Sequence, residues 1–175
     1  MGERNYSFDA NTALADGAAA QTANGYAQYA GADGVWDTGG NQGVTYTEPS
    51  IDSVTSITPQ QARVDAVIAL WITAIVTSGT DKYVFMVLGS NDPAFGAGNV
   101  QILGALEFGT AGSFDVVNGI TTPAPNAIGG SMYEILFTTE QNNVKYQFVK
   151  LYVVMSGGTA PSLTFKAFGA VLPIA

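Results

Sequence analysis

The sequence contains no cysteine and no histidine, and only 11% of its 175 residues are charged. The lack of cysteine excludes a disulfide framework, a thiol nucleophile and a thiolate metal site. The lack of histidine excludes serine–histidine and cysteine–histidine catalysis, histidine metal ligands and the commonest general base. Because a typical domain is about one quarter charged, this chain has few solvated faces. We therefore expect much of its surface to be covered by like subunits or by a larger assembly.

Basic residues are also scarce. The net charge is −8, and the 6 lysine and arginine residues are scattered along the chain. A nucleic-acid groove needs clustered cations, so we predict no nucleic-acid partner. The longest uncharged apolar stretch, residues 66–80, is too short to span a bilayer. Residues 1–11 are polar and do not look like a signal peptide. We therefore expect no membrane association and a cytosolic product.

Residues 1–52 differ in composition from the rest. They are rich in Ala, Gly, Asn and Thr, and they carry seven acids against one base, Arg4. Such a segment does not bury enough surface to order itself, and residues 10–23 would make at best a poor helix around Gly17. We predict an extended N-terminal arm, 1–52, whose apolar side chains fill pockets on a partner; a flexible tail is the alternative. The candidate partner-binding residues are Tyr6, Phe8, Leu14, Tyr26, Tyr29, Trp36 and Tyr46.

Residues 53–175 read as an all-β domain. Short apolar and β-branched runs are separated by Gly, Pro, Asn and Asp clusters, and none shows a convincing helical pattern. Six to eight such strands predict a jelly-roll β-sandwich. The predicted strands before the closing pair are 64–76, 82–88, 100–108 (with Gly104 as a possible bulge), 114–117 and 132–139, and residues 140–143 are a predicted turn.

Two apolar runs, 144–155 and 162–172, end the domain and are joined by Ser156-Gly157-Gly158-Thr159-Ala160-Pro161. The link has the Gly and Pro content of a turn, so we predict a hairpin at the heart of the domain. The first run is apolar on both faces, which indicates burial inside a sandwich or under a covering layer. Lys150 lies among these apolar residues, and we expect its side chain to snorkel or to form an ion pair.

Few patterns suggest chemistry. Glu107 and Glu134 lie in predicted strands and are the carboxylates that would form a glycosidase pair, although solvent-facing strand carboxylates are ordinary. Residues 78–81 and 90–92 offer oxygen ligands but lack the acidic spacing of a calcium loop. The glycine-rich residues 39–43 follow no strand and precede no helix, so they do not predict a phosphate site. We expect no enzyme activity, no catalytic residues, no cofactor and no metal.

Three stretches resemble one known family: residues 7–14 with 18–20, residues 88–95, and residues 146–151 through 156–163. That family is the jelly-roll capsid cement (decoration) proteins of tailed, short-tailed-type bacteriophages. Residues 7–14 with 18–20 are similar to that family's N-terminal arm, and residues 88–95 to its strand-to-loop segment. Residues 146–151 through 156–163 resemble its closing hairpin. The family often has Asp-Leu-Gly after the arm, where this chain has Trp36-Asp37-Thr38-Gly39.

The resemblance implies a viral structural protein. Such a protein is made in the host cytoplasm and binds the outside of the shell of major capsid protein, where it stabilises seams between subunits. The expected assembly is a small homo-oligomer, a dimer or a trimer, on the capsid exterior of the virion. The alternative is a carbohydrate- or receptor-binding jelly-roll module, such as a fibre head, that stacks sugars on exposed Trp and Tyr.

Overall fold

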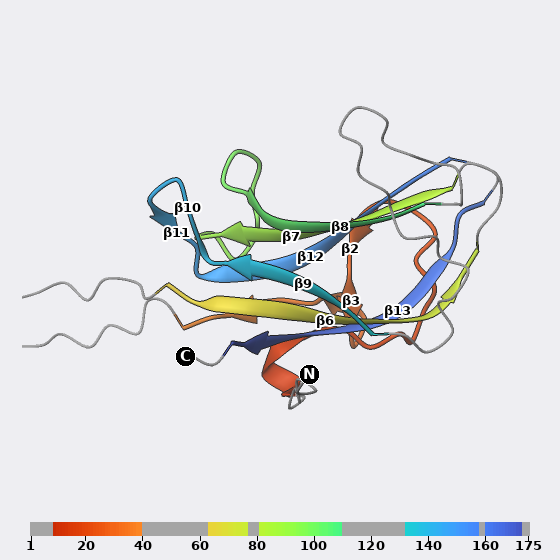
Figure 1. Cartoon of the computed structure of the whole chain (residues 1–175), viewed down its shortest axis with the longest axis horizontal. Helices are drawn as coiled ribbons and strands as arrows, with labels where there is room; N and C mark the ends of the chain where they lie inside the picture. The colour runs from red at the N-terminus through yellow and green to blue at the C-terminus, as the bar shows by residue number, and fades with distance from the viewer. Residues whose placement is uncertain (1–8, 40–62, 77–80, 110–131, 158–159, 173–175) are drawn as a thin grey trace, which may run out of the picture.

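The computed structural model describes residues 9–39, 63–76, 81–109, 132–157 and 160–172. Two antiparallel sheets lie face to face (Figure 1). The first sheet has the strand order β1-β13-β6-β9, and the second has the order β2-β12-β7-β8 with β5 also on β12. Within the described residues the only helical element is the 3-10 turn η1 (Ala10–Thr12). The all-β sandwich prediction is confirmed, and the jelly-roll connectivity stays a prediction.

Six long strands make the body of the sandwich, and sequence patterns place all six within a few residues. The predicted strand at 114–117 lies outside the described residues. The body strands are β6 (Asp65–Ile75), β7 (Lys82–Ser90), β8 (Gln101–Gly109), β9 (Met132–Thr138), β12 (Phe148–Ser156) and β13 (Leu163–Val171).

The core lies between the sheets. Alternate residues of each strand point inward, as the two-residue period of a strand requires; Val149, Leu151 and Val153 of β12 are fully buried. Phe85 packs edge-to-face against Phe165 of the opposite sheet at 5.1 Å between ring centroids. Rings of this size each bury about 150–250 Å² and prefer this geometry, so cross-sheet aromatic packing holds the two layers together.

The predicted closing hairpin is wrong. β12 pairs with β7 and β13 pairs with β6, so the two strands lie in different sheets. Both strands bury one face in the same core, and they meet across that core rather than edge to edge. The link between them therefore passes from one sheet to the other. A Gly- and Pro-rich link shows that the chain reverses, but it does not decide whether the flanking strands pair or face each other.

A small hairpin follows β9. β10 (Glu140–Gln141) pairs with β11 (Val144–Lys145) through Asn142 and Asn143. Both asparagines have positive φ, 52° and 62°, as the primed two-residue hairpin turns require. The turn predicted at 140–143 is confirmed at Asn142 and Asn143, whereas Glu140 and Gln141 form β10. The run from residue 144 to 155 is divided into β11 and β12.

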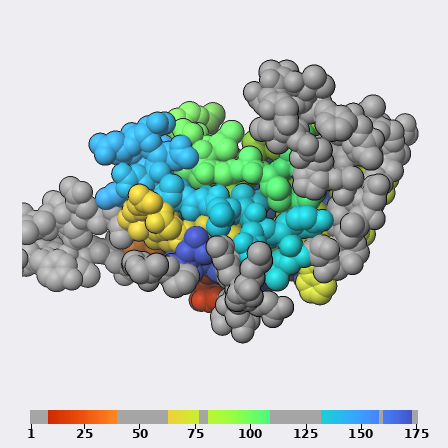
Figure 2. Space-filling view, in the orientation of Figure 1, coloured from red at the N-terminus to blue at the C-terminus, as the bar shows by residue number. Residues whose placement is uncertain are grey.

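β8 and β9 close one side of the sandwich, where the first sheet meets the second (Figure 2, green and cyan). A side chain at Gly104 would place its Cβ 2.9 Å from the carbonyl oxygen of Leu136, so this close approach needs glycine. The register of β8 against β7 shifts next to Gly104, between Val87 and Leu88. This irregularity agrees with the predicted bulge.

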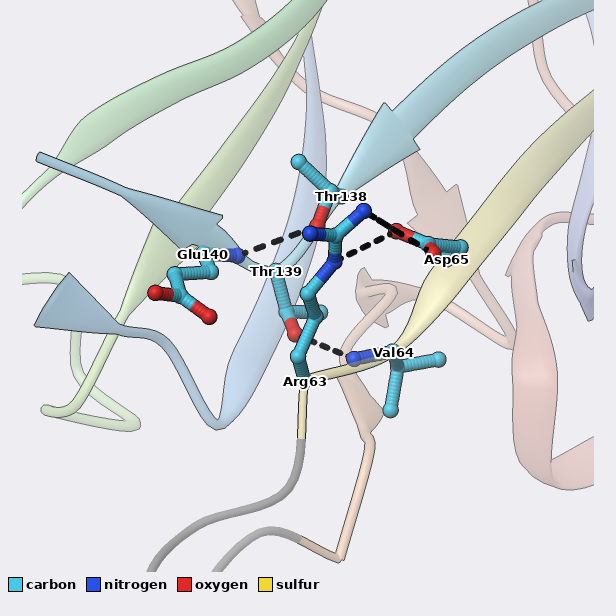
Figure 3. A network of polar contacts seen from close by, with 6 residues as sticks. All are labelled: Arg63, Val64, Asp65, Thr138, Thr139 and Glu140. Carbon is cyan, nitrogen blue, oxygen red and sulfur yellow. Dashed lines mark hydrogen bonds and ion pairs between the residues drawn. The ribbon is translucent and has the colours of Figure 1, made fainter. Parts of the chain in front are cut away.

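The start of β6 is fixed by a polar network (Figure 3). The Val64 amide donates to Oγ1 of the buried Thr139 at 2.9 Å, and the Thr139 amide donates to the Val64 carbonyl at 2.9 Å. Arg63 and Asp65 form a forked pair, with Nε to Oδ1 at 2.9 Å and Nη2 to Oδ2 at 3.0 Å. The Arg63 hydrogen bond is the main cause that lowers the pKa of Asp65.

Residues 9–39, which we call the strap, close the other side of the sandwich. The strap puts β1 on the edge of β13 and puts β2 and β5 on the edge of β12, so it passes from one sheet to the other. For these residues the predicted arm outside the sandwich is wrong, and the predicted domain boundary at 52/53 lies outside the described residues. The strands of the strap are β1 (Ala13–Ala15), β2 (Gly25–Tyr26), β3 (Gln28–Tyr29), β4 (Ala32–Asp33) and β5 (Trp36–Asp37).

Candidate functional site

Four of the seven predicted partner-binding residues lie in the strap. Leu14 is fully buried and Trp36 is 5% exposed, both in this chain's own core. The prediction that these two side chains dock on the shell is therefore wrong, because they are core residues of the sandwich. Tyr26 and Tyr29 are half-buried. Tyr6, Phe8 and Tyr46 lie outside the described residues.

Trp36 is inserted beneath β13. A Cβ at Gly169 would lie 2.3 Å from Cε3 of the indole, so only glycine leaves room for this ring. The ring also packs edge-to-face on Phe137 of β9, at 6.1 Å between centroids. Trp36 thus joins the strap to the far edge strand of the first sheet. Its neighbours Asp37 and Val35 are exposed, so the flanking sequence does not indicate that Trp36 is a core residue.

Lys150 of β12 lies in a box of strap and loop residues. Its Nζ donates to Oδ2 of Asp33 at 3.1 Å, and it lies 4.6 Å from the ring centroid of Tyr26 and 4.8 Å from that of Phe95. Tyr26 also packs edge-to-face on Tyr152, at 5.1 Å between ring centroids. The Lys150 side chain is only 7% exposed. The predicted ion pair of Lys150 is confirmed.

The contacts in this box are structural: they hold separate segments of the chain together. Burial, with smaller contributions from Asp33 and Tyr152, raises the pKa of Tyr26, which keeps its phenol neutral beside the lysine. A cation over two aromatic faces and against one carboxylate is stabilised by both. The box therefore ties together three segments: the strap, β12 and the loop between β7 and β8 that carries Phe95.

The two carboxylates considered for hydrolysis stand on different sheets. Glu107 of β8 pairs with Lys82 of β7 at 2.6 Å. Glu134 lies on the outward row of β9 and is exposed. A salt bridge on one and a solvent-facing position for the other are ordinary structural roles. Within the described ranges, no group of three or more acidic side chains is arranged to hold a metal ion.

The loops also use their polar groups internally. Asp92 accepts the amides of Ala94 at 2.9 Å and Gly96 at 3.1 Å, so this predicted turn is held by its own carboxylate. Asp16 accepts the amides of Ala18 and Ala30, both at 2.9 Å, and these bonds lower its pKa. A cavity of about 510 Å³ lies within the strap, and half of the residues that line it are alanine or glycine. Of its polar residues, Asp16 and Asp33 are already engaged in the contacts described above.

The outer face of the first sheet exposes three large apolar side chains. Trp71 of β6 is 47% exposed, and Met132 and Leu136 of β9 are 57% and 56% exposed. Trp71 and Met132 are directly opposite each other in the register. Val67 and Ala69, on the same row of β6, are buried, and the exposed Glu134 stands between Met132 and Leu136 on the outward row of β9. We call Trp71, Met132 and Leu136 the apolar face.

Sequence reasoning does not find the apolar face, because both alternating rows of residues 66–76 are rich in apolar side chains. The signal that separates the rows is the period of two: Leu70 and Ile72 are in the core cluster, so Trp71 between them points outward. Lys166 of β13 stands beside it, with Nζ 5.7 Å from the indole centroid. An exposed row of this kind typically marks an interaction surface.

No helix in the described part of the chain has the length and hydropathy needed to cross a bilayer. Comparison of the chain with protein-family models, with curated proteins and with solved structures found no match.

Proposed function

We propose that this chain is a non-enzymatic capsid cement protein that binds the outside of a shell of major capsid protein and stabilises seams between its subunits. The observation that carries the proposal is the apolar face on a sandwich with very few charges. Trp71, Met132 and Leu136 expose about half of each side chain to water on two adjacent strands. A small protein gains by covering such a row with a partner.

The composition and the sequence resemblance support the same function. Only 11% of the residues are charged, which suits a protein whose surface is shared with neighbours. The segment 88–95, one of the stretches that resemble the cement proteins, carries Phe95 into the Lys150 box. On a shell, an interface of ordinary size repeated many times would resist pressure without tight individual affinity. We propose a small homo-oligomer as the bound form, on the exterior of the virion.

The test is binding of purified protein to empty shells that lack it, measured by co-sedimentation. Trp71→Thr with Leu136→Thr keeps β-propensity while removing two of the three side chains of the apolar face, and we expect at least a tenfold loss of affinity (about 1.4 kcal/mol). Ile102→Thr is the matched control, because Ile102 is 48% exposed on β8 of the other sheet. The control variant should bind as the wild type does.

Two results would overturn the proposal. If the wild-type protein fails to bind shells, the function is wrong. If the double variant binds as well as the control, with the same melting temperature, the apolar face is not the docking surface.

One observation favours a second function. Trp71 is a half-exposed indole beside Lys166, and an accessible tryptophan is a stacking platform for a sugar ring. A carbohydrate-binding module would bind glycans through Trp71 and would not bind shells. Glycan titration distinguishes the two, because the fluorescence of exposed Trp71 would respond while that of buried Trp36 would not.

A further inference from the structure

Besides its buried side chains, the strap contacts the sandwich through backbone hydrogen bonds along strand edges. Gln21 and Leu163 exchange amide-to-carbonyl bonds of 2.8 and 3.0 Å, and the Ala27 amide donates to the Leu151 carbonyl at 2.8 Å. Each strand of the strap is only two or three residues long. The edges of β12 and β13 on this side of the sandwich, which the strap covers, are carried by every copy of the chain. We call the space between these two edges, which the strap fills, the cleft.

The cleft and the strap have complementary charge. The strap contains four acids, Asp9, Asp16, Asp33 and Asp37, and no base. The cleft provides Lys150, paired with Asp33 at 3.1 Å, and Lys166, whose side chain lies against the strap at Gly17, where an added Cβ would be 3.1 Å from the lysine Cγ. An acidic segment that adds short strands to both edges is therefore the occupant that this cleft fits.

The chain between strap and body is longer than the distance it joins. At the end of the strap the Thr38 amide donates to the Gln147 carbonyl at 3.0 Å. The amide of Tyr146, the residue before Gln147, donates to the Thr139 carbonyl at 2.8 Å, and Thr139 in turn pairs with Val64 at the start of the body. The two ends thus lie at the same end of the sandwich, which a turn of a few residues would connect. The sequence instead has 23 residues, 40–62, between them, longer than compact domains usually need.

We propose that the cleft between β12 and β13 accepts the strap of a second copy of this chain, so that protomers exchange straps within an oligomer. Each copy keeps every contact of its cleft, because an identical strap fills it. A link of 23 residues reaches up to about 80 Å when extended, enough for a neighbouring subunit. Exchange of an identical element is a low-cost route to an oligomer. The inference goes beyond the proposed function, since it concerns purified protein without a shell.

The absence of cysteine from the sequence allows a direct test. Ala15 of β1 and Ala167 of β13 are partners in the register, and both are small and buried. Two single variants, Ala15→Cys and Ala167→Cys, are unfolded together, refolded as an equimolar mixture and oxidised. A strap that exchanges places the two cysteines, which come from different chains, opposite each other. We expect disulfide-linked heterodimers on a non-reducing gel.

The control uses a pair inside the body. Thr164 of β13 and Ala74 of β6 are also register partners, but neither strand belongs to the strap. A mixture of Thr164→Cys and Ala74→Cys should give only the background level of dimer. A second strap pair, Asp37→Cys with Phe148→Cys, keeps the test valid if cysteine at Ala15 or Ala167 prevents folding.

The proposal is overturned if neither strap mixture gives more heterodimer than the body control. In that case the double variant Ala15→Cys/Ala167→Cys would close its disulfide within one chain, and the cleft would hold its own strap. Shell binding is assayed separately with cysteine-free protein, so failure of strap exchange and failure of the proposed function are distinguishable.

Discussion

For each of the two tryptophans of this protein, the exposure of the side chain is the opposite of what the neighbouring sequence indicates. Trp36 lies in the acidic, alanine-rich strap and is 5% exposed, whereas Trp71 lies in a long apolar strand and is 47% exposed. Trp36 enters the core because the strap crosses both sheet edges and Gly169 leaves space for the ring. Trp71 stays outside because its register position on β6 points away from the core. Register and close approach decide burial here, and average composition does not.

Deletion of residues 1–39, which removes the strap and its tryptophan, should have the largest effect on stability. It removes Leu14 and Trp36 from the core and uncovers the edges of β12 and β13. Burial of these two side chains alone is worth about 5 kcal/mol, comparable with the whole stability of many domains. We expect loss of the cooperative thermal transition, followed by circular dichroism. A truncated protein with a wild-type melting temperature would show that the strap is a dispensable arm.

Alanine at each tryptophan separates the two environments directly. Trp36→Ala should cost about 3–5 kcal/mol of unfolding free energy, because it leaves a large cavity between the strap and β13. Trp71→Ala should cost less than about 1 kcal/mol, as is usual for exposed positions, but should weaken shell binding. Urea denaturation measures the first effect and co-sedimentation the second. Equal destabilisation by both substitutions would contradict the assignment.

The Lys150 box should show strong coupling between strap and body. Asp33→Asn leaves a buried ammonium without its counterion. We expect a loss of about 1–3 kcal/mol, less than for a fully buried pair because the Asp33 side chain is 42% exposed. Lys150→Met fills the box with an apolar chain, so the double variant Asp33→Asn/Lys150→Met should be more stable than Asp33→Asn alone. Additive losses in this double-mutant cycle would show that the two residues do not interact.

The smallest expected effect is that of acid on the strap. The amides of Ala18 and Ala30 hold the pKa of Asp16 below its ordinary value of 3.8. Because the pKa of Asp16 is lower in the folded than in the unfolded state, the ionised carboxylate stabilises the fold above about pH 4. This stabilisation is lost as the pH falls through the pKa of the folded state. The melting temperature of Asp16→Asn should therefore lie below that of the wild type at pH 7, and the gap should narrow in acid. A gap that is the same at both pH values would exclude this role.

The sequence predicts the body well and the strap poorly, for physical reasons. The strands β6 to β9, β12 and β13 have local patterns that depend only on each strand's own alternation, and Asn142 and Asn143 specify their turn locally. The strap strands have two or three residues each, too few to show a period. The placement of the strap depends on distant partners: Leu163 for Gln21, Gly169 for Trp36 and Lys150 for Asp33.

The candidate site shows the same division. The ion pair of Lys150 was foreseeable because a lysine among apolar neighbours needs a counterion, but its partner Asp33 was not, since 117 residues separate them. The closing link was misread because turn residues do not specify which sheet the next strand joins. The apolar face can be identified only once the inward-facing residues of β6 and β9 are known, because the residues between them then face outward.

The central claim is that the strap completes a sandwich of this protein, its own or that of a second copy, while the apolar face contacts the shell. Hydrogen–deuterium exchange on the free and the shell-bound protein tests this claim most directly. The account predicts that the amides of Ala27 and Thr38, bonded to β12 and its flank, are protected before any shell is added. Binding should then slow exchange in β6 and β9 and leave the strap unchanged. Rapid exchange of the strap amides in the free protein, with protection only on binding, would contradict the account.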